Sequence, residues 1–120
     1  MGGLAYFVSA HGYGHAARAS AVMNAVRVAR PETHLHVITT APRWFFAESL
    51  SRDFAYHRLE VDVGMVQRTS LEEDPGATVQ RVQELLDPRA GVLAEAVACL
   101  EKLDCEVVIC DISPIGVLAA

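Results

Sequence analysis

The segment from Leu4 to Arg18 constrains the fold of this chain more than any other part of the sequence. It reads Leu-Ala-Tyr-Phe-Val-Ser-Ala-His-Gly-Tyr-Gly-His-Ala-Ala-Arg. The apolar run 4–8 is typical of a buried strand, and residues 16–30 carry apolar side chains at the spacing of an amphipathic helix. A glycine-containing loop between a strand and a helix presents backbone N–H groups at the helix N-terminus, where anions bind well. The segment therefore predicts a strand–helix unit with a ligand-binding loop.

Strand and helix patterns alternate along the rest of the chain. They predict strands at 35–39, 54–59 and 107–110, a short helix from Pro42 to about Leu50, a long connection over 60–73, and helices opened by Asp74-Pro75 and Asp87-Pro88. This alternation favours an α/β fold, and the clearest strands are apolar along their length, as strands covered on both faces are. We predict a Rossmann-like, doubly wound parallel sheet.

The length of 120 residues suits one small domain. Three to four strand–helix units are fewer than a domain of this class usually has. The apolar stretch Ile115–Ala120 looks like the start of another helix with no stop signal. We therefore expect a sheet that is incomplete at its carboxyl end and a chain that is the front piece of a larger protein.

Composition and charge indicate the class of protein and which binding partners are excluded. Hydrophobic residues make up 52% of the chain and charged residues 21%, which indicates a folded domain, and the net charge of -5 argues against a nucleic-acid partner. No apolar run is long enough for a transmembrane segment, and the first residues do not resemble a signal peptide. Three cysteines without Cys-x-x-Cys spacing predict reduced, buried thiols (Cys99, Cys105 and Cys110). These features predict a cytoplasmic location.

The carboxyl ends of parallel strands form the usual ligand-binding edge of such sheets. His15 and Asp111 both fall at that edge. A neutral imidazole suits a general base that takes a proton from an acceptor hydroxyl, and a carboxylate on its other nitrogen would fix its tautomer. Two alternatives stay open for His15, a helix cap or a ligand contact without proton transfer, and Asp111 could equally be an Asx-turn or helix cap.

Other residues at this edge are candidates for substrate binding. Glycines allow positive φ and close backbone approach, long connections often bind ligands, and a basic side chain one helical turn from the loop could face an anion. The candidates are His11, Gly12, Gly14, Arg18, Gln67 and Ser113. Each has a plainer interpretation as a turn, capping or solvated residue. The aromatic run 44–46 is expected in the core, although an exposed member could stack on a sugar.

Three rival chemistries lack the residues they need. His11 and His15 resemble half of a metal site, but no third ligand is suitably spaced. Gly12-x-Gly14-x-x-Ala17 resembles a dinucleotide fingerprint, but no acidic residue ends the second strand. A phosphate loop would need Gly-Lys-Ser/Thr, which does not occur. We therefore expect no metal and no cofactor, and we expect the histidines at 34 and 36 to lie on a partly exposed strand face.

The stretch Val8-Ser-Ala-His-Gly-Tyr-Gly-His-Ala-Ala-Arg18 resembles the amino-terminal signature of GT-B glycosyltransferases. It is most similar to the glycosyltransferase-like domain that precedes the kinase domain of plant-type L-arabinokinases. Val63-Gly-Met-Val-Gln67 and Val108-Ile-Cys-Asp-Ile-Ser-Pro114 resemble further parts of that domain. Looser likeness extends to the bacterial peptidoglycan N-acetylglucosaminyltransferase and to plant small-molecule glucosyltransferases.

The resemblance implies two Rossmann-like domains facing across a cleft, an amino-terminal one for the acceptor and a carboxyl-terminal one for the nucleotide-sugar donor. Residues 1–120 would be the acceptor-side domain, without the donor domain, and would be inactive alone. The resemblance implies that His15 is the acceptor base and that Asp111 supports it, with the nucleotide-sugar as co-substrate and a sugar or small molecule as acceptor. The alternative is a non-catalytic sugar- or nucleotide-binding module attached to a sugar kinase.

Overall fold

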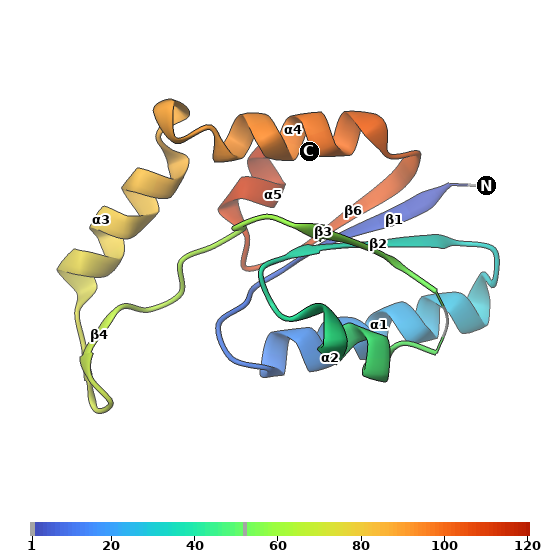
Figure 1. Cartoon of the computed structure of the whole chain (residues 1–120), viewed down its shortest axis with the longest axis horizontal. Coiled ribbons are helices and arrows are strands. Elements are labelled where there is room, and N and C mark those ends of the chain that lie inside the picture. Colours follow the sequence, from blue (N-terminus) through green and yellow to red (C-terminus); the bar gives the residue numbers. More distant parts are fainter. Residues whose placement is uncertain (1, 52) are drawn as a thin grey trace.

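A four-stranded parallel sheet forms the centre of the protein. The computed structural model describes residues 2–51 and 53–120. Its strands are β1 (Gly3–Val8), β2 (His34–Thr39), β3 (Ala55–Arg58) and β6 (Cys105–Asp111), arranged in the order β3-β2-β1-β6 (Figure 1). Each neighbouring pair is parallel, so the predicted parallel α/β sheet is confirmed.

Helices cover both faces of this sheet. Helices α1 (Gly14–Ala29) and α2 (Arg43–Ser49) lie under it in Figure 1, whereas α4 (Val92–Lys102) and α5 (Pro114–Ala119) lie over it. The chain crosses from one face to the other between β3 and α4. This arrangement is the doubly wound, Rossmann-like one.

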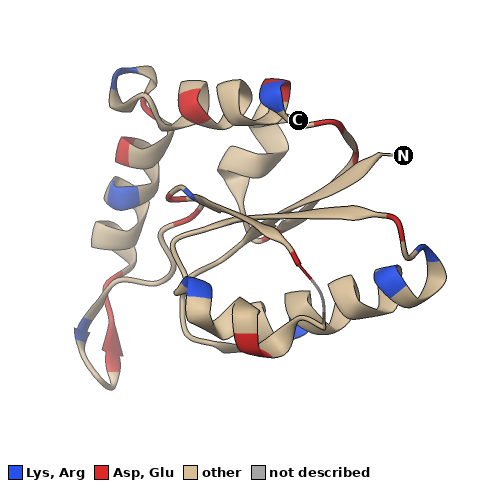
Figure 2. Cartoon of the chain, turned by 45° about the vertical axis from the view of Figure 1, so that its right-hand side comes forward, with Lys and Arg blue, Asp and Glu red and all other residues tan. Residues whose placement is uncertain are grey.

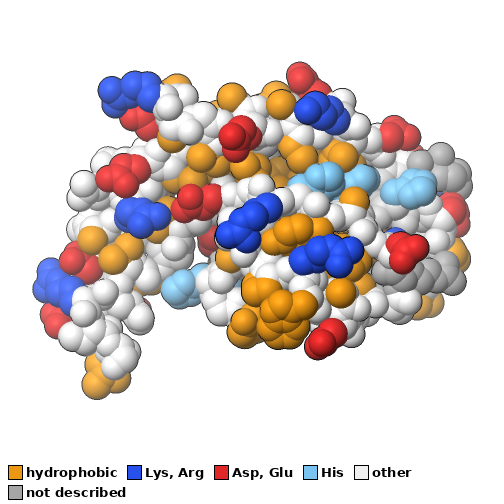
Figure 3. Space-filling model, viewed as in Figure 1, with side chains coloured by type: hydrophobic (Ala, Val, Ile, Leu, Met, Phe, Trp, Pro, Cys, Tyr) orange, Lys and Arg blue, Asp and Glu red, His pale blue; other side chains and the backbone are white. Residues whose placement is uncertain are grey.

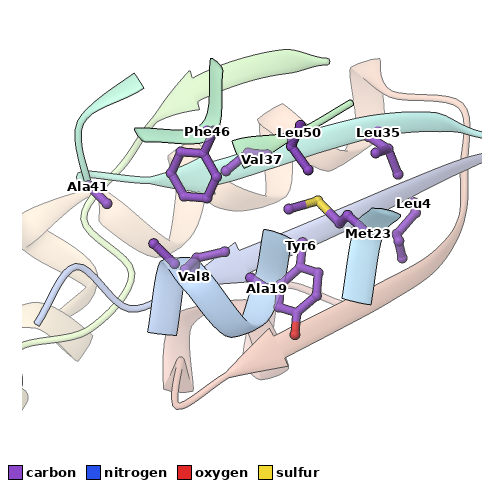
Figure 4. Packing of buried hydrophobic residues seen from close by; sticks show 11 residues of the cluster. Leu4, Tyr6, Val8, Ala19, Met23, Leu35, Val37, Ala41, Phe46 and Leu50 are labelled. Carbon is purple, nitrogen blue, oxygen red and sulfur yellow. The ribbon is translucent and has the colours of Figure 1, made fainter. Parts of the chain in front are cut away.

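The core consists of two apolar layers, one on each face of β1. Successive side chains of a strand point to opposite faces. Tyr6 and Val8 therefore pack with Met23 and Phe46 on the α1 face (Figure 4), while Phe7 packs with Ile115 on the other. Burying one such large side chain contributes roughly 1.5–3 kcal/mol. The two layers hold the carboxyl ends of the strands in fixed positions.

The connection 60–73 contains structure that the sequence analysis missed. A short antiparallel hairpin, β4 (Gln67–Thr69) with β5 (Glu72–Glu73), projects away from the sheet (Figure 1). Its side chains are exposed on both sides, so no apolar period marks it in the sequence. Helix α3 (Pro75–Leu86) follows, and the Asp74 side chain accepts a hydrogen bond from the amide of Ala77, as the Asp-Pro pair predicted.

The second Asp-Pro pair was predicted to open a helix, and the structure divides that helix into a short turn capped by Asp87 and the separate helix α4. Asp87 caps a single 3-10 turn, Pro88–Ala90, by accepting a hydrogen bond from the amide of Arg89 at 2.9 Å. Gly91, at φ 77°, adopts a left-handed conformation that ends this turn, and α4 begins at Val92.

Charged side chains are spread over the surface. Basic and acidic residues occur among the helices above and below the sheet in Figure 2, and the face shown in Figure 3 intersperses both signs. In the described part of the chain, no helix is both long and apolar enough to cross a membrane. The three cysteines are free thiols and half-buried rather than fully buried, and burial raises the pKa of each.

Candidate functional site

The carboxyl ends of β1, β2 and β6 meet at one edge of the sheet, which we call the rim. Val8 at the end of β1 pairs in register with Asp111 at the end of β6. The loop after β1 therefore lies beside the loop after β6, although about a hundred residues separate them in the sequence. This register brings together the two loops that the sequence analysis singled out.

His15 and Asp111 meet across the rim. Nδ1 of His15, in the first turn of α1, lies 3.1 Å from Oδ2 of Asp111. The imidazole is 21% exposed and the carboxylate 11% exposed, so the pair is shielded but open to a ligand. This distance meets the geometric condition for a base supported by a carboxylate, while the catalytic roles stay predictions.

Arg18 joins this pair from the next turn of α1. One of its terminal nitrogens lies 3.1 Å from Nδ1 of His15 and 3.5 Å from Oδ2 of Asp111. A guanidinium only donates, so Nδ1 cannot donate to the carboxylate and accept from Arg18 at once. An ionised Asp111 that accepts from both neighbours satisfies all three groups and leaves Nε2 of His15 free to accept a proton.

The charge of Asp111 reaches into the core below the rim. The Tyr6 side chain packs in the α1-face layer (Figure 4). Burial raises the pKa of its hydroxyl, and the Asp111 carboxylate raises it further, while Arg18 opposes this effect. The Asp111 carboxylate therefore acts more strongly on Tyr6 than the Arg18 guanidinium does.

The residues after Asp111 form a constrained turn. Ile112 has φ 51°, a left-handed conformation that is costly for a β-branched residue. The turn lets the Ser113 hydroxyl accept from the amide of Gly116 at 2.9 Å and donate to the carbonyl of Val61 at 2.7 Å. Ser113 is 3% exposed and its single hydroxyl proton is used, so it is a helix cap, and this geometry argues against the predicted substrate contact.

The glycine loop is open toward solvent. Gly12 has φ 75°, and an added Cβ at either Gly12 or Gly14 would meet no atom within 4 Å in the described structure. Tyr13, the N-cap of α1, makes no side-chain cap hydrogen bond there, so the first amides of α1 keep their capacity to bind an anion.

The aromatic run after β2 divides between core and surface. Phe46 is fully buried, as predicted, but Trp44 is 53% exposed. The ring of Tyr13 stacks on that of Phe45 at a centroid distance of 5.3 Å and lies 6.0 Å from Trp44. An aromatic surface thus borders the glycine loop.

Two polar contacts in the structure were not predicted from the sequence. Ser9 donates a hydrogen bond to Asp62 at 2.5 Å at the rim, and a polar residue directly after an apolar strand was the one signal for it. On the α4 face, Nδ1 of His36 lies 3.2 Å from Nε2 of His57. Burial lowers the pKa of both imidazoles, and the charge of His57 lowers that of His36 further.

The remaining predicted residues do not join the His15 cluster. Gln67 lies exposed in the β4–β5 hairpin, which projects from the sheet (Figure 1). Nowhere in residues 2–51 and 53–120 do three or more potential ligands form a metal-binding group. An apolar hollow lined by Leu4, Val26 and Ile109 lies at the opposite edge of the sheet, near the starts of β1 and β6, and is not part of the rim.

Comparison with known proteins gives one informative match. Over 118 residues, 97% of its length, the chain is 31% identical to L-arabinokinase of Arabidopsis thaliana. The chain is similar to part of L-arabinokinase. It spans 11% of that protein's length. No model of a protein family matches the chain.

Proposed function

We propose that this chain is the acceptor-side part of a glycosyltransferase, with His15 as the base. The observation that carries the proposal is the contact between His15 and Asp111 beside an open glycine loop. In the proposed reaction, Nε2 of His15 takes the proton of an acceptor hydroxyl as its oxygen attacks the anomeric carbon of a nucleotide-sugar. The bond from that carbon to the phosphate oxygen breaks, and the nucleoside diphosphate leaves with the electron pair.

Asp111 supports this step through charge and orientation. Its carboxylate holds the Nδ1–H tautomer and stabilises the imidazolium as it forms, in the manner of a catalytic triad. While its positive guanidinium contacts the pair, Arg18 disfavours the formation of a positive charge on His15. Its side chain is 63% exposed and therefore free to move toward a phosphate of the donor, which is the role we assign to it. A second, donor-binding domain would complete the site.

One observation favours a second candidate, a non-catalytic sugar-binding module attached to a kinase. The relative's name describes a sugar kinase, and the matched segment is 11% of that protein. Such a module would keep the rim as a binding surface and would not need His15 to exchange a proton.

A turnover measurement separates the two candidates. In a polypeptide that carries this segment with a donor-binding domain, His15→Ala should lower kcat for sugar transfer by roughly 10²–10⁴-fold, the usual contribution of a general base. His34→Ala, at an exposed histidine of β2, is the matched control and should leave kcat unchanged. Full turnover in His15→Ala would exclude the base and favour the binding module.

A further inference from the structure

The segment 59–64 crosses the rim and is bonded to three strand ends; we call it the rim strap. The amide of Leu59 donates to the carbonyl of Thr39 at 3.2 Å, at the end of β2. The carbonyl of Val61 accepts from Ser113, beyond β6. The carboxylate of Asp62 accepts from Ser9, beyond β1. The rim strap is therefore held against the loop that leads to His15 and the turn that follows Asp111.

Asp62 is fixed at the carboxyl end of β1 by its contact with Ser9. Ser9 is 1% exposed and directly follows Val8, the register partner of Asp111. The Ser9 hydroxyl donates its hydrogen bond to Oδ2 of Asp62. Asp62 itself is half-buried. An ionised carboxylate accepts through both of its oxygens. Among the described residues nothing donates to Oδ1, so this oxygen can accept a hydrogen bond from a ligand.

The rim strap also determines where the His11 ring lies. The amide of His11 donates to the Ser9 hydroxyl at 3.3 Å. Gly64 packs so closely on the ring that an added Cβ would lie 2.6 Å from Nδ1 of His11. His11 thus lies against the rim strap as a second polar group with donor and acceptor capacity.

We propose that Asp62 binds a hydroxyl group of a carbohydrate acceptor, with its carboxylate held in place by Ser9. This inference rests on the proposed function, because the bound hydroxyl would orient a neighbouring hydroxyl of the same sugar toward His15. The ligand class follows from the chemistry of the group. A carboxylate accepts hydrogen bonds from hydroxyls and repels phosphate, so the subsite selects an uncharged, polyhydroxylated ligand.

Sugar binding can be measured without any transfer reaction. The isotopically labelled chain is titrated with free pentoses and hexoses, one at a time at millimolar concentrations, while its amide and imidazole NMR signals are followed. At least one sugar should shift the signals of residues 9–11 and 61–64, and inorganic phosphate should leave those of 61–64 unchanged. Asp62→Asn should weaken sugar binding about tenfold or more, since a hydrogen bond to a charged group is lost.

Glu60→Gln provides a matched control. It removes a carboxylate from the same rim strap, but Glu60 faces Arg81 at 3.5 Å. The Glu60→Gln variant should bind the sugar with the same affinity as the unchanged chain. The Asn side chain retains an oxygen for the Ser9 hydroxyl, so Asp62→Asn should fold, and its amide spectrum shows whether it does. Should it fail to fold, Asp62→Glu, which keeps the carboxylate but displaces it, serves in its place with the same expected loss.

The outcomes separate this subsite from the proposed function. If no sugar shifts the rim signals, or if Asp62→Asn binds as tightly as the unchanged chain, the subsite is wrong even where His15→Ala abolishes transfer. If sugars bind through Asp62 but His15→Ala retains full turnover, the subsite stands and the base assignment fails.

Discussion

The imidazole of His15 and the carboxylate of Asp111 lie 3.1 Å apart, although 96 positions of sequence separate them. Two features of the fold produce this contact. The parallel register of β1 and β6 places Val8 opposite Asp111, and α1 begins six residues after Val8 with His15 in its first turn. The contact joins the first turn of α1 to the carboxyl end of β6.

Asp111→Asn tests whether the carboxylate controls the tautomer of His15. We expect kcat for sugar transfer to fall by a smaller factor than in His15→Ala. The imidazole base remains, but the carboxylate that holds its Nδ1–H tautomer is lost. The ¹⁵N chemical shifts of the His15 ring should show a greater share of the Nε2–H form. Asp104→Asn, at the exposed residue before β6, is the control. Unchanged ring shifts together with unchanged kcat would contradict the assignment.

Gly64→Ala should destabilise the protein through the rim strap. Gly64 has φ 70°, and a methyl group there would overlap the His11 ring. We expect the free energy of unfolding to fall by about 1–2 kcal/mol, the cost of a left-handed conformation with a side chain. Urea denaturation measures this change. Gly14→Ala is the control, because its added methyl group meets open space; equal losses in the two variants would contradict the close contact with His11.

Ile112→Gly should stabilise the protein. The left-handed backbone of Ile112, at φ 51°, is unfavourable for a β-branched residue, and its side chain is 65% exposed, so little apolar burial is lost. Removing the side chain should raise the free energy of unfolding by about 1 kcal/mol. Ile112→Ala retains the penalty and should show no such gain. Destabilisation by Ile112→Gly relative to Ile112→Ala would indicate that the side chain packs more than its exposure suggests.

Stability should depend on pH through His36 and His57. Burial lowers the pKa of both imidazoles in the folded state. The unfolded chain therefore binds protons more readily, so stability is complete above the unfolded pKa of about 6.5 and declines as the pH falls below it. Urea unfolding between pH 8 and pH 5 measures this slope. Replacing His57 by Gln should flatten this slope, whereas the same change at exposed His34 should have a smaller effect. Identical slopes in the unchanged chain and the two variants would contradict the prediction.

Some of this architecture could be predicted because it depends on local patterns. Apolar runs located the strands of the sheet, and Asp74-Pro75 located the start of α3, since an N-cap and a proline act within one helical turn. Asp87-Pro88 carried the same local signal but produced only a 3-10 turn, because Gly91 interrupts the helix four residues later. The hairpin β4–β5 gave no pattern, since neither of its faces is buried.

By itself, the sequence determined the parallel α/β class, the glycine–histidine loop and the edge of the sheet to which His15 and Asp111 belong. Periodicity and strand order suffice for these, because all carboxyl ends of a parallel sheet share one edge. Tertiary structure decided which side chains meet there. The contacts of Arg18 with the His15–Asp111 pair, of Ser9 with Asp62, and of Gly64 with His11 depend on strand register and on the path of the rim strap. No local pattern encodes those distances, because they arise only when segments far apart in the chain pack against the same sheet.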